Sequence, residues 1–204
     1  MTKKGRSTAA DLLRRIERKA PEYLDLLTAE DDAEVEGAFH AILDKSLRHL
    51  ESNRTKLTSL DEEGLTAVLS AALSIPGLTV TQEAHSNGHV DITIDFDHCV
   101  PGRRKLGEAK IERTPSYHTK GLEQLISRYT TGRELGGLLI VYVRRPGISG
   151  RVKRLRNAMD LSKPCRQQGA TRPHVLKWAF ASTHVLTSGD PHEVSHVACN
   201  MCPK

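Results

Sequence analysis

The sequence predicts an α/β fold in which a mixed central β-sheet is flanked by helices. Apolar residues recur at helical spacing in the first third of the chain, and the middle alternates polar and apolar residues as strands do. Residues 136–143 form a continuous apolar run typical of a buried strand. With 204 residues, 38% of them hydrophobic, the chain is long enough to bury the core of one such domain.

Three helices are predicted ahead of the sheet. They cover residues 9–27, a stretch from the break at 28–32 to residue 50, and residues 60–73. Their candidate core residues are Leu12, Leu13, Ile16 and Tyr23, then Val35, Phe39, Ile42, Leu43 and Leu47, then Leu65, Val68, Leu69, Ala72 and Leu73. We interpret residues 1–57 as an N-terminal helical elaboration and residues 58–204 as the main domain, together one compact unit.

Two predicted strands joined by a polar turn carry charged residues. Asp91 lies in the first strand, and Glu108 and Lys110 lie in the second. Because side chains alternate faces along a strand, Glu108 and Lys110 share a face, and a hairpin brings Asp91 beside them. Carboxylates that converge repel each other unless a cation neutralises them, and oxygen ligands select Mg²⁺ or Mn²⁺ rather than zinc. A lysine beside such a cation can orient or activate water, as a metal-dependent phosphodiesterase requires.

An amphipathic helix is predicted over residues 117–129. Its buried stripe consists of Leu122, Leu125, Ile126 and Tyr129. Its polar stripe, spaced by four residues, consists of Lys120, Gln124 and Arg128. The apolar stripe sets how the helix is rotated, so we expect Gln124 to border the charged site, near Lys110 or Glu108.

The order of these features resembles the PD-(D/E)XK nuclease superfamily over roughly residues 58–145: Asp91, Glu108-x-Lys110, a helix with Gln124, then a buried strand. Val90 rather than proline precedes Asp91. The resemblance implies a restriction-endonuclease-like core, Mg²⁺ or Mn²⁺ as cofactor, and hydrolysis of phosphodiester bonds in DNA by an endonuclease.

The resemblance also implies roles for individual residues. Asp91, Glu108 and the backbone carbonyl of Ala109 would hold the metal, and Lys110 would position or deprotonate water. Gln124 would orient water, Lys110 or a phosphate. A glutamate on the helix before the first strand often adds a carboxylate in the resembled superfamily, and Glu62 is favoured here. Its neighbour Glu63 stays open, as does a plain surface acid near the positive end of the helix dipole.

The net charge of +5 suits a polyanionic partner. The candidate phosphate contacts are Lys120, Arg128, Arg144, Arg145, Arg151 and Arg154. Such residues bind backbone phosphates without reading sequence, although a solvated helix face is an equal alternative. DNA is the expected partner and RNA stays open. The resemblance implies a role in restriction, repair or phage defence, as a homodimer or within a larger defence complex.

Two classes of function stay open. The first is the Mg²⁺-dependent endonuclease. The second is a catalytically silent nuclease-like module that binds nucleic acid or acts as an adaptor. The loss of a metal carboxylate would indicate a silent module, and Asp91, Glu108 and Lys110 are all present. The sequence therefore favours the enzyme.

The C-terminal segment allows two interpretations. The spacing of His192, His196, Cys199 and Cys202 can suit zinc. The residue pattern instead favours a β-hairpin with its turn at 187–191. In a strand, Cys199 and Cys202 would lie about 10 Å apart and face opposite sides, so they could not share a zinc ion.

The sequence also predicts a cytoplasmic location. No apolar run approaches the roughly 18 residues of a membrane span. The basic start lacks the apolar segment of a secretory signal. We therefore expect the four cysteines to be thiols.

Overall fold

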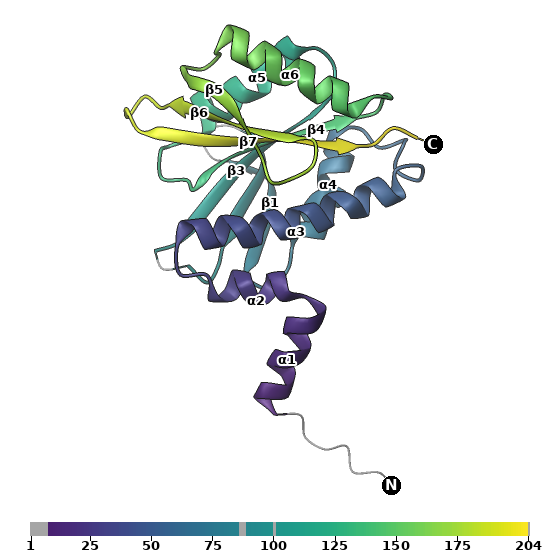
Figure 1. Cartoon of the computed structure of the whole chain (residues 1–204), viewed down its shortest axis with the longest axis vertical. Coiled ribbons are helices and arrows are strands. Elements are labelled where there is room, and N and C mark those ends of the chain that lie inside the picture. The colour runs from purple at the N-terminus through teal and green to yellow at the C-terminus, as the bar shows by residue number, and fades with distance from the viewer. Residues whose placement is uncertain (1–7, 86–88, 100, 204) are drawn as a thin grey trace.

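The computed structural model describes residues 8–85, 89–99 and 101–203, and of residues 83–85 and 89 it describes the backbone only. The protein has an α/β fold, with a seven-stranded mixed sheet flanked by helices (Figure 1). This confirms the predicted fold class. Among the described residues, no helix is long and apolar enough to cross a membrane.

Among the described residues, four helices precede the first strand, and the remaining helical segments lie between strands. The helical segments are α1 (Ala9–Lys19), α2 (Pro21–Thr28), α3 (Asp32–Asn53), α4 (Glu62–Leu73), α5 (Pro115–Glu123), the π-helical turn η1 (Gln124–Tyr129) and α6 (Ile148–Ser162). The strands are β1 (Leu78–His85), β2 (His89–Phe96), β3 (Arg103–Ile111), β4 (Gly136–Val143), β5 (Gln167–Pro173), β6 (Ala179–Val185) and β7 (Pro191–Asn200).

The strand order across the sheet is β1-β2-β3-β4-β7-β6-β5. Strands β1, β2 and β3 are antiparallel neighbours, whereas β3, β4 and β7 run parallel. In an open sheet with parallel strands, ligands tend to bind beyond the carboxyl ends of those strands. A ligand-binding site is therefore expected at the carboxyl ends of β3, β4 and β7.

Helices α3 and α4 cover one face of the sheet, and α5 and α6 cover the other (Figure 1). On the first face, Phe39 and Leu43 of α3 pack in one cluster with Ile140 and Tyr142 of β4. On the second face, Leu122 and neighbouring residues pack against the opposite side of the same strands. Helix α3, which belongs to the predicted N-terminal elaboration, thus shares its core with the sheet.

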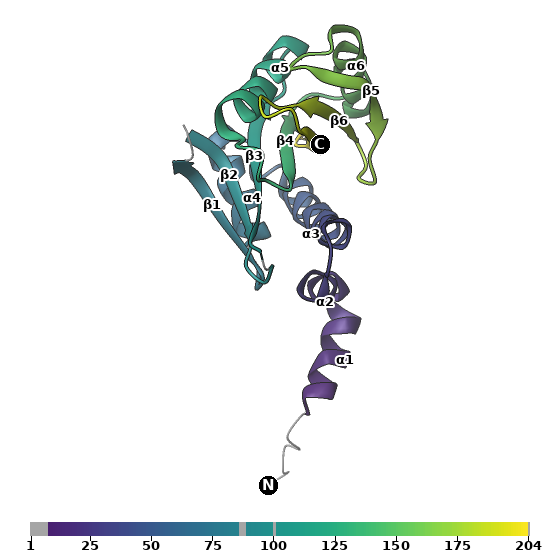
Figure 2. The ribbon, with the colours of Figure 1, turned by 90° about the vertical axis from the view of Figure 1, so that its left-hand side faces the viewer.

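The first predicted helix is divided at Ala20, which corrects the single helix expected over residues 9–27. Pro21 begins α2, because proline has no N–H to donate and suits the first position of a helix. Helix α1 projects from the body (Figure 2), and none of its residues is buried. Leu12 and Leu13 are 56% and 51% exposed, so the expectation that they belong to the core was wrong.

The C-terminal hairpin is confirmed, but it is not peripheral. Strands β6 and β7 pair in antiparallel fashion, and β7 also pairs in parallel with β4, so the hairpin completes the central sheet. Strand β5 was not predicted, because its mostly exposed residues lack an apolar pattern.

The cysteines are all free. His196 donates and accepts hydrogen bonds with His118 and Ser182 inside the protein. Within the described ranges, no group of three or more His, Cys, Asp or Glu side chains is arranged so that it could hold a metal ion. The antiparallel pairing of β6 with β7 agrees with the hairpin interpretation of this segment.

Candidate active site

The side chain of Lys110 lies among three carboxylates. Its Nζ is 2.6 Å from Glu108 Oε1, 3.4 Å from Glu62 Oε1 and 3.8 Å from Asp91 Oδ2. We call these four residues the Lys110 cluster. Its members come from β2, β3 and α4, elements that are far apart along the chain. The structure thus brings together the residues that the sequence analysis connected.

The backbone of β3 holds two of the carboxylates in place. Asp91 Oδ2 accepts a hydrogen bond from the N–H of Ala109 at 2.9 Å, and Glu62 Oε2 accepts one from the N–H of Ile111 at 2.7 Å. These two N–H groups flank Lys110 along the strand. The orientation of both carboxylates is therefore fixed relative to the lysine.

The start of α4 explains how Glu62 reaches the cluster. Asp61 caps the helix by accepting a hydrogen bond from the N–H of Gly64 at 2.9 Å, so α4 begins at Glu62. Arg144, the residue that follows β4, donates a hydrogen bond to the carbonyl of Leu60. Together these contacts attach the first turn of α4 to the carboxyl end of the sheet.

Glu108 is buried, at 1% exposure. One oxygen pairs with Lys110, whereas Oε2 is buried and has no hydrogen-bond partner among the described residues. Burial, and after it the charge of Asp91, raise the pKa of Glu108 to about 7 against the opposing effect of Lys110. A buried polar atom without a partner is costly, so this oxygen is suited to receive a ligand.

Lys110 remains an ammonium group in this arrangement. Burial by itself would lower its pKa, but the hydrogen bond with Glu108 and the charges of Glu108, Asp91 and Glu62 outweigh burial and raise the pKa well above its ordinary value. A lysine held in the charged form donates hydrogen bonds and stabilises negative charge. It is a poor proton acceptor as long as the carboxylates surround it.

The Lys110 cluster opens into a pocket of about 290 Å³. The pocket is lined by Asp61, Glu62, Glu63, Thr66, Gln82 and Asp91. Glu62 and Asp91 belong to both the pocket and the cluster. Gln82 was not singled out by the sequence analysis, because only the pairing of Gln82 with Ile92 between β1 and β2 reveals its position.

Of the two glutamates left open by the sequence, Glu62 is the one that contacts Lys110. We predict that Glu62→Gln lowers Mg²⁺-dependent cleavage by at least about 10-fold, as expected when a charged group that orients a site is removed. Glu17 is an exposed glutamate of the projecting helix α1, so Glu17→Gln is the matched control and should cleave at the wild-type rate. Rates of plasmid cleavage for the two variants test this, and equal losses in both would contradict it.

The helix that carries Gln124 is less regular than predicted. Residues of the predicted buried stripe are buried, namely Leu122, Leu125, Ile126 and Tyr129. However, α5 continues as the π-helical turn η1 from Gln124, so residues spaced by four no longer stay aligned on one face.

Gln124 itself is half-buried, and its side chain makes no hydrogen bond with a described residue. Its expected link to Lys110 or Glu108 therefore stays a prediction. Gly121 brings the helix close to the site, because a Cβ at that position would lie only 3.2 Å from Lys110 Cγ.

Tyr129 was expected from the sequence only as a core residue. Burial raises its pKa, and the charges of Glu108 and Asp91 raise it further.

The basic residues predicted to contact phosphates fall into two groups. Arg144 is bound to Leu60, and Arg151 donates hydrogen bonds of 2.7 and 2.9 Å to the carboxylate of Glu112. Both guanidinium groups are thus engaged in contacts within the protein. The exposed members of the set are Lys120, Arg128, Arg145 and Arg154.

Comparisons with protein-family models, with curated proteins and with solved structures found no match to this chain. The functional interpretation therefore depends on the residues of the Lys110 cluster and on their geometry.

Proposed function

We propose that the protein is a Mg²⁺-dependent endonuclease of the PD-(D/E)XK type that hydrolyses phosphodiester bonds in DNA. The observation that carries the proposal is the convergence of Glu62, Asp91 and Glu108 on Lys110 beside an open pocket. The order of the elements also supports it. Helix α4, strands β1 to β3, helix α5 and strand β4 follow one another in the order on which the sequence resemblance rests.

The cluster contains the kind of ligand that a divalent metal ion takes, although its three carboxylates, as the structure describes them, are not arranged around a common cation position. Glu62, Asp91 and Glu108 supply carboxylate oxygens and Ala109 supplies a backbone carbonyl, the hard ligands that Mg²⁺ and Mn²⁺ prefer. Glu108 Oε2 is buried without a partner among the described residues, as expected of an oxygen that awaits a cation. A bound cation would neutralise the carboxylates and polarise the scissile phosphate. The carboxylates now face the ammonium group, so metal binding requires side-chain rotations.

The side chain of Lys110 has a role that follows from its charge. As an ammonium it can hold a water molecule or a phosphate oxygen by hydrogen bonds and stabilise the negative charge that develops during phosphodiester hydrolysis. Its raised pKa favours this positioning role over deprotonation of water. Glu62 and Asp91, fixed to the β3 backbone, keep the ammonium oriented.

The pocket beside the cluster is acidic, which affects how nucleic acid binds. Asp61, Glu62, Glu63 and Asp91 all line it, and they repel a phosphate backbone until a cation neutralises them. The exposed residues Lys120, Arg128, Arg145 and Arg154 would contact the backbone outside the pocket. We therefore propose that tight binding of DNA, and not only its cleavage, depends on the metal.

One observation favours the second candidate, a silent nuclease-like module that binds nucleic acid or acts as an adaptor. The ammonium group of Lys110 balances the carboxylates without any cation. Such a cluster can be purely structural. The resemblance also implies a biological role in restriction, repair or phage defence. RNA as a substrate stays open. A homodimer or a larger defence complex is part of the same proposal.

The two candidates differ in a direct experiment. Calorimetric titration of the protein with Mg²⁺ and Mn²⁺ should show binding, and supercoiled plasmid should be converted to nicked and linear forms with either metal but not with a chelator. Metal binding without cleavage of DNA or RNA would favour the silent module. Absence of both would overturn the endonuclease proposal.

We predict that Lys110→Met reduces cleavage by about 10²-fold or more, the effect typical of removing a group that stabilises charge in the transition state. Metal binding should persist, because an ammonium does not ligate a cation, and removal of the competing charge should strengthen it. Calorimetry and plasmid cleavage on the same variant separate the two effects. Loss of metal binding in a folded variant would instead make Lys110 a structural counter-ion.

A further inference from the structure

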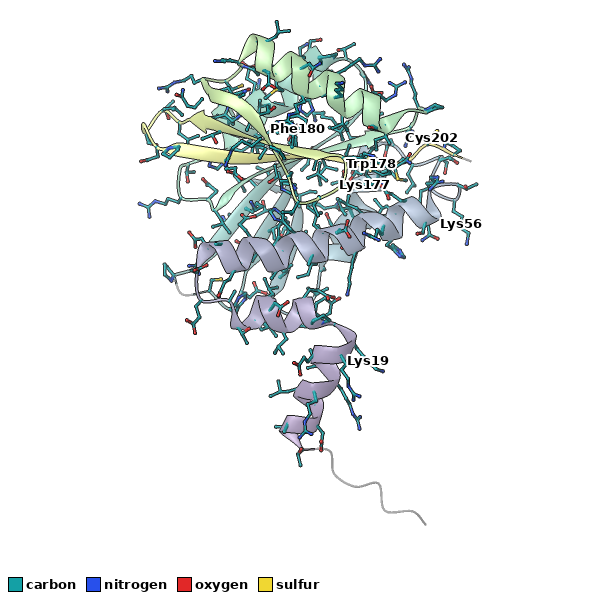
Figure 3. The ribbon with its side chains drawn as sticks, viewed as in Figure 1. Lys19, Lys56, Lys177, Trp178, Phe180 and Cys202 are labelled. Carbon is teal, nitrogen blue, oxygen red and sulfur yellow. The ribbon has the colours of Figure 1, made fainter. Side chains whose placement is uncertain are left out.

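A second pocket, of about 190 Å³, lies between helix α3 and the loop that leads into β6. Its walls include Leu47, Arg48 and Glu51 of α3 and Leu176, Lys177 and Trp178 of the loop. Figure 3 shows Lys177 and Trp178 together on this loop, near α3. We call it the Trp178 pocket. None of the residues that line the Trp178 pocket belongs to the Lys110 cluster.

Trp178 is the only tryptophan of the chain, and its backbone is unusual. Its φ of 58° lies in the left-handed region, which large side chains rarely adopt. The strand β7 stabilises this conformation, because the N–H of Ala198 donates a hydrogen bond to the Trp178 carbonyl at 3.1 Å. Strained backbone of this kind is concentrated at sites where a side chain must be presented to a ligand.

The charged side chains around the pocket are balanced. Lys177 Nζ lies 4.5 Å from the centre of the Trp178 ring, and Arg48 is paired with Asp44 at 2.7 Å. Glu51 Oε1 accepts a hydrogen bond from the backbone of β7 at 2.8 Å. Because the two cationic side chains are balanced by two carboxylates, the pocket prefers neither an anion nor a metal ion as its ligand. They do offer donors and acceptors beside an aromatic ring, which together suit a planar heterocycle.

The pocket lies at the same end of the sheet as the Lys110 cluster. Lys110 is the register partner of Val141, Val141 is the partner of Ala198, and Ala198 is bonded to Trp178. With neighbouring strands about 4.8 Å apart, the backbone of Trp178 lies about 14 Å from that of Lys110. A nucleic-acid strand whose phosphate is at the cluster would extend over this distance within a few nucleotides.

We infer that the Trp178 pocket is a nucleobase-binding subsite, which holds one unpaired base of the strand whose backbone lies at the Lys110 cluster. The inference rests on the proposed function in so far as the ligand is a nucleic acid. The base displaces the ammonium of Lys177 from the face of the Trp178 ring and stacks there, and Arg48 and Glu51 supply a donor and an acceptor to its edge. Stacking on an aromatic side chain is sequence-tolerant, so the pocket selects unpaired strands rather than one base.

The single tryptophan provides the test, because its fluorescence reports on this pocket alone. The probes are a short single-stranded DNA of mixed sequence and an abasic strand of the same length, titrated at low ionic strength in buffer that contains Ca²⁺, an oxygen-binding cation that neutralises the carboxylates of the acidic pocket. The base-containing strand should quench the fluorescence to saturation, and the abasic strand should bind at least about 5-fold more weakly. Equal effects of the two strands, or no quenching, would overturn the inference and leave the loop as a surface for protein partners.

Variants extend the test to a second measurement, the anisotropy of a labelled strand. Trp178→Ala and Arg48→Ala should each weaken binding of the base-containing strand by about 5-fold or more, whereas Trp178→Phe should retain most of it. Arg15→Ala, on the projecting helix α1, removes the same charge as Arg48→Ala and should have no effect. Unchanged binding by both pocket variants would overturn the inference.

The outcome is independent of catalysis. Base-dependent quenching without plasmid cleavage would support the subsite and contradict the nuclease. Plasmid cleavage without base-dependent quenching would support the nuclease and contradict the subsite.

Discussion

Glu108→Gln is expected to abolish Mg²⁺-dependent DNA cleavage, with a loss of at least about 10²- to 10³-fold, the range seen when one preorganised electrostatic group is removed from an active site. Glutamine keeps the shape of the side chain but removes the charge that a divalent cation requires. Glu108 is the carboxylate closest to Lys110, and its Oε2 is the buried oxygen without a partner among the described residues.

The same substitution should not unfold the metal-free protein. The pKa of Glu108 is raised by burial and by Asp91, so the charged carboxylate costs free energy in the folded state near neutral pH. A neutral amide removes that cost, and the melting temperature without metal should be unchanged or higher. The variant Asp91→Ala should lose Mg²⁺-dependent DNA cleavage to a degree similar to that of Glu108→Gln.

Plasmid cleavage and thermal unfolding with and without Mg²⁺ test both statements. Glu123→Gln, an exposed glutamate of α5, is the control for the loss of one carboxylate. Wild-type cleavage by Glu108→Gln or Asp91→Ala would show that the metal is not held by the cluster. A melting temperature that no longer responds to Mg²⁺ in these variants, but still responds in Glu123→Gln, would support it.

The sequence could predict the part of the site that depends on local periodicity. Glu108 and Lys110 share a face because they alternate with Ala109 in one strand, and the returning strand places Asp91 beside them. The buried stripe of the α5 and η1 segment likewise follows from residue spacing. These inferences need no information about distant parts of the chain.

Contacts between distant elements were beyond such reasoning. The choice between Glu62 and Glu63 depends on how α4 docks on β3, which Asp61 and Arg144 determine. The Trp178 pocket requires α3 to pass beside a loop more than a hundred residues later. The predicted burial of Leu12 and Leu13 failed for a related reason: amphipathic spacing indicates an apolar stripe, but not whether the protein provides a surface to cover it.

Acid should destabilise the protein strongly, because several imidazoles are buried in neutral form. Four hydrogen bonds form a buried chain: His118 Nε2 with His196 Nδ1 at 2.9 Å, His196 Nε2 with Ser182 Oγ at 2.7 Å, Ser182 Oγ with His184 Nε2 at 2.7 Å, and His184 Nδ1 with the Cys165 carbonyl at 3.0 Å. A carbonyl only accepts, so His184 Nδ1 must carry a hydrogen. If each ring is neutral, the direction of every other bond in the chain follows, and His118 donates to His196.

A proton added to His196 Nδ1 or His184 Nε2 turns an acceptor nitrogen into a donor that faces another donor. A proton added to His118 Nδ1, which is buried and has no partner among the described residues, creates a buried charged donor without an acceptor. Burial accordingly lowers the pKa of His118 to about 4, that of His196 well below its ordinary value and that of His184 as well. His40, His174 and His192 also have pKa values lowered to about 4, mainly by burial. In each case the unfolded chain binds a proton more readily than the folded protein does.

The direction of the pH effect follows from these shifts. The stability due to a neutral histidine is present above its unfolded pKa of about 6.5 and is lost as the pH falls through the window from about 6.5 to 4. At pH 5, His118 alone should lower the free energy of unfolding by about 2 kcal/mol relative to pH 7.5. Glu108 acts in the opposite direction, since its raised pKa favours the folded state at lower pH, but one carboxyl group opposes several histidines.

His118→Gln isolates the effect, because its amide N–H can replace the Nε2–H that His196 accepts while the side chain no longer titrates. Thermal unfolding of the wild type at pH 7.5 and pH 5.0 should show a large fall in melting temperature. In the variant that fall should be smaller by about 4–8 °C, the shift expected for roughly 2 kcal/mol in a chain of this size. His49→Gln, at an exposed position of α3, should behave like the wild type. The same pH dependence in His118→Gln and in the wild type would show that the buried imidazole chain does not control acid stability.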